Sequence, residues 1–103
     1  MQPIIIISTY PNENSAITTI KKALNAKAVA CASLTKVRSL YWWNNNIEDS
    51  EEYLVLFKTL KNRSEELKRI IKEDHPYKVP EILEVNINDV DRPYFEWLIE
   101  SVK

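Results

Sequence analysis

Apolar residues follow two distinct spacings along this chain, and these spacings predict its helices and strands. Four consecutive isoleucines at positions 4–7 are apolar on both faces, which is typical of a central strand covered on both sides. Between Ala16 and Leu24 apolar residues recur every third or fourth position, as in an amphipathic helix. Over the whole chain the two spacings predict strands at Pro3–Thr9, Ile47–Thr59 and Ile82–Asn88, and a further strand that the small residues Ala28–Ser33 enter and Leu34–Trp43 continue. They predict helices between Asn12 and Lys27, Asn62 and His75, and Asp91 and Val102.

Side chains near the predicted boundaries supply the usual helix signals. Asn12 is a candidate N-cap for the first helix, and Asn62 with Glu65 has the spacing of a capping box. The pair His75-Pro76 ends the second helix because proline cannot continue one. In the fourth strand the alternation predicts a core-facing side made of Leu83, Val85 and Ile87 and a solvent-facing side made of Glu84, Asn86 and Asn88.

The order of these elements is strand, helix, strand, strand, helix, strand and a terminal helix. This order predicts an α+β fold of the ferredoxin-like type, in which helices cover an antiparallel sheet. A length of 103 residues suits one domain, so we interpret residues 1–103 as a single domain.

The second and third strands would form an unusually long hairpin. Each arm runs about thirteen to sixteen residues, against about five or six for a usual strand. At about 3.3 Å per residue such arms reach roughly 40 Å, beyond a compact core of this size. The tip would expose Tyr41, Trp42 and Trp43 together with unpaired strand edges. We therefore expect these three residues to lie at an interface between copies of the chain.

The chain contains no glycine, which constrains its turns. Every position with positive φ is then expected to fall to Asn or Asp, the residues that tolerate it best after glycine. The run Asn44–Asn46 fits this expectation, with Asn45 the best candidate for the left-handed conformation.

Charge and composition argue against several classes of partner. The net charge is −1 with basic and acidic residues interleaved, so the basic patch of a nucleic-acid-binding protein is absent. No apolar run approaches the roughly 20 residues needed to span a bilayer, and the first residues do not resemble a signal peptide. The single cysteine, Cys31, excludes an internal disulfide and indicates a reducing cytosol. We expect a cytoplasmic protein without nucleic-acid or membrane partners.

Few residues are candidates for chemistry. His75, the only histidine, could ligate Cu²⁺ or Zn²⁺, act as a base near neutral pH, or interact favourably with a helix C-terminus. Cys31 lies among alanines, where packing is favoured over a metal or nucleophilic role. Trp42 and Trp43 could stack a ligand, although aromatic residues on a strand are more typical of a core or interface. We interpret Glu51-Glu52 as a solvated face, with a hard-metal site as the alternative.

Several short segments resemble the CutA divalent-cation tolerance proteins. The match extends from Ile5 through Trp97, in order and with fitting spacing. Its most specific parts are the His-Pro-Tyr loop and the Tyr-Trp-Trp hairpin. The segments that carry the resemblance are Ala30-Cys31, Ser39-Leu40-Tyr41-Trp42-Trp43, Lys58-Thr59, His75-Pro76-Tyr77 and Pro80-Glu81-Ile82.

This resemblance implies a homotrimer similar in architecture to the PII-type nitrogen signalling proteins, with the long hairpins packed against neighbouring subunits. It also implies a link to divalent-metal tolerance, with copper the ion most often named. A cleft between subunits would be lined by Cys31, Lys58, Tyr77 and Glu81. The residue types alone also allow Lys58 and Glu81 to be solvated or ion-paired surface charges.

The resemblance also marks candidate metal ligands. Some members of the family carry Cys at the position of Ser8 and a second His at the position of Asp74, and both positions bear on copper binding there. Ser8 is a poor ligand for soft copper, whereas Asp74 with His75 suits a borderline divalent ion.

The leading hypothesis is a non-enzymatic homotrimer of the CutA type that binds divalent metal, copper included, or a small ligand at clefts between subunits. One alternative is a PII-like signalling or scaffold trimer without a physiological metal. Another is a small hydrolase of the acylphosphatase type. That chemistry needs a glycine-rich phosphate loop with an arginine, and the absence of glycine disfavours it.

Overall fold

The computed structural model describes all residues from Met1 to Lys103, and its four strands form one antiparallel sheet. In chain order the strands are β1 (Pro3–Tyr10), β2 (Cys31–Trp43), β3 (Asn46–Leu60) and β4 (Leu83–Asn86). Across the sheet they follow the order β2-β3-β1-β4. The helices are α1 (Glu13–Asn25), α2 (Ser64–Glu73), which a short 3-10 turn (Lys61–Arg63) precedes, and α3 (Arg92–Ser101). The α+β class and the antiparallel sheet expected from the sequence are confirmed.

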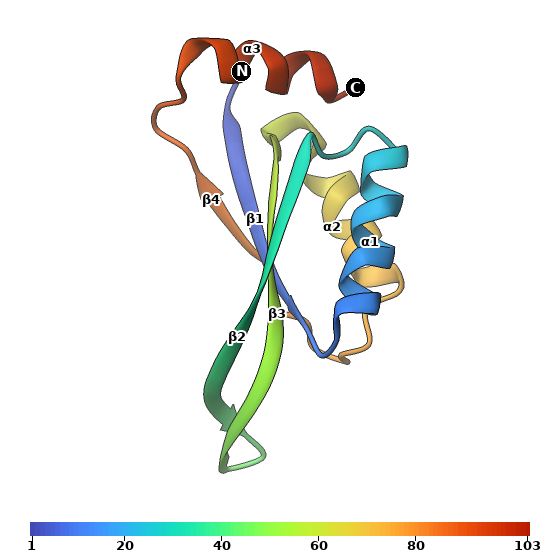
Figure 1. Cartoon of the computed structure of the whole chain (residues 1–103), viewed down its shortest axis with the longest axis vertical. Coiled ribbons are helices and arrows are strands. Elements are labelled where there is room, and N and C mark those ends of the chain that lie inside the picture. The colour runs from blue at the N-terminus through green and yellow to red at the C-terminus, as the bar shows by residue number, and fades with distance from the viewer.

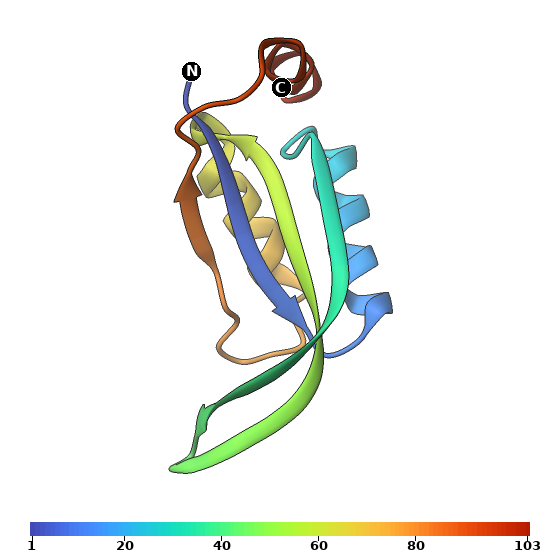
Figure 2. The same cartoon turned by 60° about the vertical axis from the view of Figure 1, so that its left-hand side comes forward.

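The helices cover only one face of this sheet. Helices α1 and α2 lie side by side on that face, whereas α3 lies across the end of the sheet where the chain begins (Figure 1). The view in Figure 2 shows the same arrangement from a second side, with no helix over the opposite face. We call this opposite face of the sheet the open face. None of the helices is long and apolar enough to cross a membrane.

The main core lies between the sheet and the two helices α1 and α2. On the sheet its fully buried side chains include Ile4, Ile6 and Tyr10 of β1 and Val55 and Phe57 of β3. Each large apolar side chain buried in this way stabilises the fold by about 1.5–3 kcal/mol. The helices complete the core with Ala16, Ile20, Ala23, Leu67, Ile70 and Ile71.

The open face is also apolar. Ile7 pairs with Leu56 of β3 and with Leu83 of β4, and directly paired residues project from the same face of a sheet. Ile5 and Val85 form the next pair along β1 and β4. Leu83 and Val85 are 52% and 45% exposed in the single chain. The four isoleucines of β1 therefore face alternately a covered core and an uncovered apolar surface.

The orientation predicted for the fourth strand is wrong. Leu83 and Val85 lie on the open face instead of the helix-covered core, and Glu84 points toward α2. Glu84 is bound there by Lys61, Lys68 and the hydroxyl of Ser64, which compensates its burial. The alternation defined an apolar side of the strand but could not tell which side the helices cover. The strand is also shorter than predicted, and Asn88 follows it in an exposed loop.

One of the two predicted helix caps is present. The side chain of Asn12 accepts a hydrogen bond of 2.8 Å from the backbone N–H of Ser15, as expected for the N-cap of α1. The capping box at the start of α2 does not form, because the chain makes a 3-10 turn there and α2 begins only at Ser64. The Ser64 hydroxyl is directed to Glu84 instead.

Three residues have positive φ, and one of them was not expected. Asn44 and Asn45 have φ of 49° and 63°, which makes the two-residue turn of the hairpin type I′. Lys27 has φ of 58° at the end of α1. The next residue, Ala28, donates to the carbonyl of Ala23 at 3.0 Å, and Lys27 itself donates to Leu24. These bonds close a Schellman motif, so a helix end imposes the left-handed conformation on a lysine.

The long hairpin is confirmed. β2 and β3 have 13 and 15 residues, and the part near the turn bends away below the rest of the sheet (Figures 1 and 2). Leu40, Trp42 and Ile47 near the tip are 62%, 71% and 65% exposed. A single chain therefore leaves large apolar side chains of the hairpin in solvent.

Candidate functional site

A concave site lies between the hairpin and the loop that joins α2 to β4. It is a groove of about 610 Å³, within the usual size range of small-molecule sites. We call it the hairpin groove. β1 and the hairpin line it with Thr9, Ser39, Leu40, Tyr41, Trp43, Glu48 and Glu52, and the loop adds Tyr77, Lys78, Val79 and Glu81.

His75 fastens this loop to the body of the protein. Its Nδ1 accepts a hydrogen bond of 3.1 Å from the backbone N–H of Tyr77, so the neutral ring carries its proton on Nε2. That nitrogen lies 3.4 Å from the hydroxyl of Ser8. The imidazole also stacks on the ring of Tyr10, with centroids 4.3 Å apart. Burial lowers the pKa of His75, partly offset by the Thr9 backbone and by the nearby charge of Glu52.

A second bond joins the loop to the hairpin. The hydroxyl of Tyr77 donates to Oε2 of Glu52 at 2.7 Å. Glu52 is only 6% exposed, whereas its sequence neighbour Glu51 is exposed and pairs with Lys36 at 2.8 Å. Burial and the bond to Glu52 together raise the pKa of the Tyr77 hydroxyl. The interpretation of Glu51-Glu52 as one solvated face is therefore wrong for Glu52.

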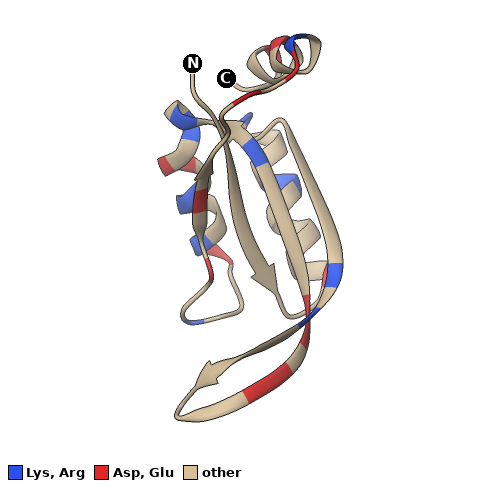
Figure 3. Cartoon of the chain, turned by 90° about the vertical axis from the view of Figure 1, so that its left-hand side faces the viewer, with Lys and Arg blue, Asp and Glu red and all other residues tan.

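The groove carries more negative than positive charge. Glu48, Glu52 and Glu81 line it together with a single basic residue, Lys78. None of these four side chains takes part in an ion pair. Burial, with a contribution from the charge of Glu52, raises the pKa of Glu81. Figure 3 shows the acidic residues of β3 following one another along this part of the hairpin.

The three predicted metal ligands do not converge in this structure. Ser8 and His75 lie together, but the carboxylate of Asp74 is bound by Lys22 of α1. No group of three or more His, Cys, Asp or Glu side chains lies close enough to hold a metal ion. The residues of one chain therefore do not fit a copper centre, which needs several nitrogen or sulfur donors.

The predicted cleft residues separate into two places. Tyr77 and Glu81 both line the hairpin groove. Cys31 and Lys58 are direct cross-strand partners at the far end of the hairpin, where Lys58 donates to the hydroxyl of Ser33 at 3.3 Å. Lys58 follows Glu52 by six positions along β3, a span of roughly 20 Å. Cys31 and Lys58 therefore cannot reach the groove of their own chain.

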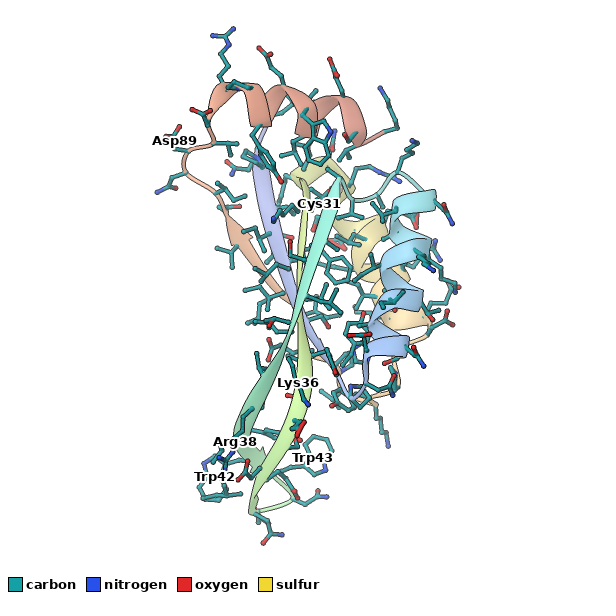
Figure 4. All side chains as sticks on the ribbon, viewed as in Figure 1. Cys31, Lys36, Arg38, Trp42, Trp43 and Asp89 are labelled. Atoms are coloured by element: carbon teal, nitrogen blue, oxygen red, sulfur yellow. The ribbon has the colours of Figure 1, made fainter.

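The predicted interface aromatics are also divided. Tyr41 and Trp43 line the hairpin groove. Trp42 pairs with Ile47 on the other face of the hairpin. Figure 4 shows Trp42 and Trp43 on opposite sides of the hairpin and Cys31 at its far end. Among the groove residues, Glu48 was not predicted from the sequence, and Glu52 was expected on a solvated face. Glu48 pairs with Tyr41, and Glu52 lies four residues further along β3, so both project from the same face of the hairpin as Tyr41 and Trp43. This two-residue alternation was the signal available in the sequence.

Comparison with known proteins connects this architecture to one family. The sequence model described as CutA1 divalent ion tolerance protein matches residues 4–101. The divalent-cation tolerance protein CutA of Pyrococcus horikoshii is 42% identical over 97% of this chain and 98% of its own length. The protein of the same name from Thermotoga maritima is 35% identical over 96% of this chain and 98% of its own.

Solved structures agree with this result. CutA1 from Pyrococcus horikoshii superposes with a TM-score of 0.93 at 42% identity, covering 97% of this chain and 98% of that one. CutA1 from Oryza sativa gives a TM-score of 0.95 at 27% identity, covering 100% and 95%. The Archaeoglobus fulgidus structure, described as a periplasmic divalent cation tolerance protein, also gives 0.95 at 27% identity, over 98% and 99%. On sequence and on structure, this chain belongs to the CutA1 divalent ion tolerance family.

Proposed function

We propose that this protein contributes to divalent-cation tolerance by binding rather than by catalysis, and that the hairpin groove is its ligand site. The observation that carries the proposal is the buried carboxylate of Glu52 in the lining of a groove that holds two more carboxylates without an ion pair. Uncompensated negative charge in a partly buried site attracts cations and cationic ligands. The name shared by the relatives, divalent-cation tolerance protein, supports a role connected with cations.

The assembly we propose is a homotrimer of ferredoxin-like protomers. Leu83, Val85 and the exposed apolar residues of the hairpin give a single chain more uncovered apolar surface than a stable monomer usually shows. β2 and β4 are the two edge strands and lie on opposite sides of the sheet, so copies can associate head to tail in a closed ring. The number three rests on the resemblance to the family. We place the protein in the cytosol because of its single free cysteine, Cys31.

The nature of the metal follows from the donors. Carboxylate oxygens suit hard or borderline divalent cations such as Mn²⁺ or Zn²⁺, and Glu52 and Glu81 would supply them. A copper centre would require His75 and further nitrogen or sulfur donors from another copy. We therefore favour carboxylate ligation over copper ligation within one protomer.

Two measurements test these proposals. Size-exclusion chromatography with light scattering should give a mass of about three chains, and a monomer at micromolar concentration would reject the trimer. Calorimetric titration with Mn²⁺, Zn²⁺ and Cu²⁺ should compare the wild type with Glu52→Gln and His75→Ala. The groove assignment predicts that Glu52→Gln weakens binding of Mn²⁺ and Zn²⁺. Unchanged binding in that variant would show that the metal is held elsewhere.

A further inference from the structure

We propose that one water molecule binds inside the protein, where β1, α1 and the loop after α2 meet, and that the hydroxyls of Ser8, Tyr10 and Thr19 hold it. These three residues are 0%, 0% and 1% exposed in the single chain. The site is therefore closed within one chain, and association of copies neither creates nor removes it. It is also independent of the ligand proposed for the hairpin groove.

The first observation is the hydroxyl of Tyr10. It is completely buried, and no group of the protein lies in hydrogen-bonding geometry with it. The ring is held in place by stacking on the imidazole of His75, with centroids 4.3 Å apart. A buried hydroxyl that loses its water without gaining another partner destabilises the folded state. The Tyr10 hydroxyl thus calls for a small polar partner.

The second observation is that two more buried hydroxyls lie beside the first. Burial raises the pKa of the Tyr10 hydroxyl, and the neighbouring hydroxyls of Thr19 and Ser8 partly offset this effect. Each neighbour has one long contact of its own. Oγ of Ser8 lies 3.4 Å from Nε2 of His75, and Oγ1 of Thr19 lies 3.4 Å from the carbonyl oxygen of Ser15. Since hydrogen bonds are strongest at about 2.7–3.0 Å, all three hydroxyls keep unused bonding capacity.

Donors and acceptors around these hydroxyls match a water molecule. Neutral His75 carries its proton on Nε2, so Ser8 accepts from it and can donate its own proton elsewhere. Thr19 donates to the carbonyl of Ser15, so its oxygen can still accept. A water at the centre accepts from Ser8 and Tyr10 and donates to Thr19. This gives it about three hydrogen bonds, the usual number for a buried water.

The water connects α1 to the loop. His75 binds the backbone of Tyr77 through Nδ1 and faces Ser8 through Nε2. With the water in place, Ser8 is joined in turn to Thr19 of α1. Thr19 is then a positioning residue for the loop, acting through the water, Ser8 and His75.

The test begins with the wild-type protein. A crystal structure at about 1.5 Å resolution should show one water within roughly 3.2 Å of Oη of Tyr10 and of at least one of the other two hydroxyls. Absence of this water would overturn the inference, as would a direct bond between Tyr10 and Thr19 in its place.

Tyr10→Phe keeps the ring and removes the hydroxyl, so the sign of its effect on stability is informative. Loss of a hydroxyl bonded to water should lower the midpoint of urea unfolding, whereas loss of an unpaired buried hydroxyl should raise it. We expect a lower midpoint together with loss of the water from the crystal structure of the variant. A higher midpoint would contradict the water site.

A matched pair of threonines tests the positioning role. Thr19→Val should remove the water and speed hydrogen exchange of the Tyr77 amide severalfold, without a comparable change at core amides. Thr18→Val is the control, because Thr18 is the next residue of α1, is exposed and bonds the carbonyl of Asn14 at 2.9 Å. It should change neither the water nor the exchange of Tyr77. Equal effects of the two substitutions on Tyr77 would reject the connection through the water.

Discussion

The hydroxyl of Tyr77 and the carboxylate of Glu52 lie 2.7 Å apart, and this bond joins the loop after α2 to the hairpin 25 residues away in sequence. At the same residue the backbone N–H of Tyr77 is bound by His75. The loop is thus fixed at two points, one on the body of the protein and one on the hairpin. Because the groove lies between these two parts, its shape depends on both bonds.

The first prediction concerns this link. Tyr77→Phe removes the donor and leaves the buried carboxylate of Glu52 without a partner, so the free energy of unfolding should fall by about 1–3 kcal/mol. Urea unfolding followed by circular dichroism measures the change. Tyr41→Phe is the matched control, because its hydroxyl meets Ser50 at 3.3 Å in an exposed position and should contribute less than about 0.5 kcal/mol. Equal losses in the two variants would contradict the role assigned to Glu52.

The second prediction concerns Glu84, whose contacts with Lys61, Ser64 and Lys68 lower its pKa to about 2. A carboxyl group with a depressed folded-state pKa stabilises the protein above its unfolded value of about 4.5, and this contribution is lost as the pH falls toward 2. Glu84→Gln should therefore cost about 1–3 kcal/mol at pH 6 and roughly half of that or less at pH 3.

Urea unfolding of wild type and Glu84→Gln at pH 6, 4 and 3 measures this convergence. Glu65→Gln serves as the control, because the Glu65 side chain is 92% exposed and its one ion pair, with Lys68, is 3.9 Å long. A difference between wild type and Glu84→Gln that stays constant with pH would show that Glu84 does not act through its charge.

The third prediction concerns the open face. If copies associate through it, Leu83→Glu places a charge in a buried apolar interface and should convert the assembly to monomers. Light scattering after size-exclusion chromatography measures the mass. Leu24→Glu is a suitable control, since Leu24 is an exposed apolar residue of α1 on the other side of the sheet and should leave the mass unchanged. A trimeric Leu83→Glu protein would exclude this face as the contact.

Much of the fold could be predicted from local patterns. The two-residue and 3.6-residue periods gave the order of the elements, and the long apolar hairpin with its Asn44-Asn45 turn needed no tertiary information. These patterns could not show that Leu83 and Val85 of β4 lie on the open face of the sheet. Because β1 is apolar on both faces, neither side of the sheet is marked as the one that the helices cover, and only packing of α2 against Glu84 decides it.

The site was predictable only where its parts are close in sequence. The bond between His75 and Tyr77 spans two residues and belongs to a motif visible in the chain. The bond between Tyr77 and Glu52 depends on how far the hairpin bends toward the loop, which no local pattern encodes. Neighbouring residues also contact different partners: the carboxylate of Asp74 pairs with Lys22, whereas the ring of His75 lies against the hydroxyl of Ser8. The expected ligand set of Ser8, Asp74 and His75 is therefore not brought together within one chain.

The last prediction concerns the protonation of His75. Burial against Tyr10 and Tyr77 disfavours the charged imidazolium, so the pKa in the folded protein lies below the ordinary value of 6.5. The unfolded chain then binds a proton more readily than the folded one, and the stability contributed by neutral His75 is lost as the pH falls below 6.5. Because His75 is the only histidine, proton NMR reports its titration without ambiguity. We expect a midpoint below 6.5 in the native protein and near 6.5 in urea.

Protonation of His75 also occupies Nδ1, so the amide proton of Tyr77 should exchange slowly above the midpoint and quickly below it. A midpoint at or above 6.5, or exchange that does not follow it, would show that His75 does not hold the loop in its neutral form.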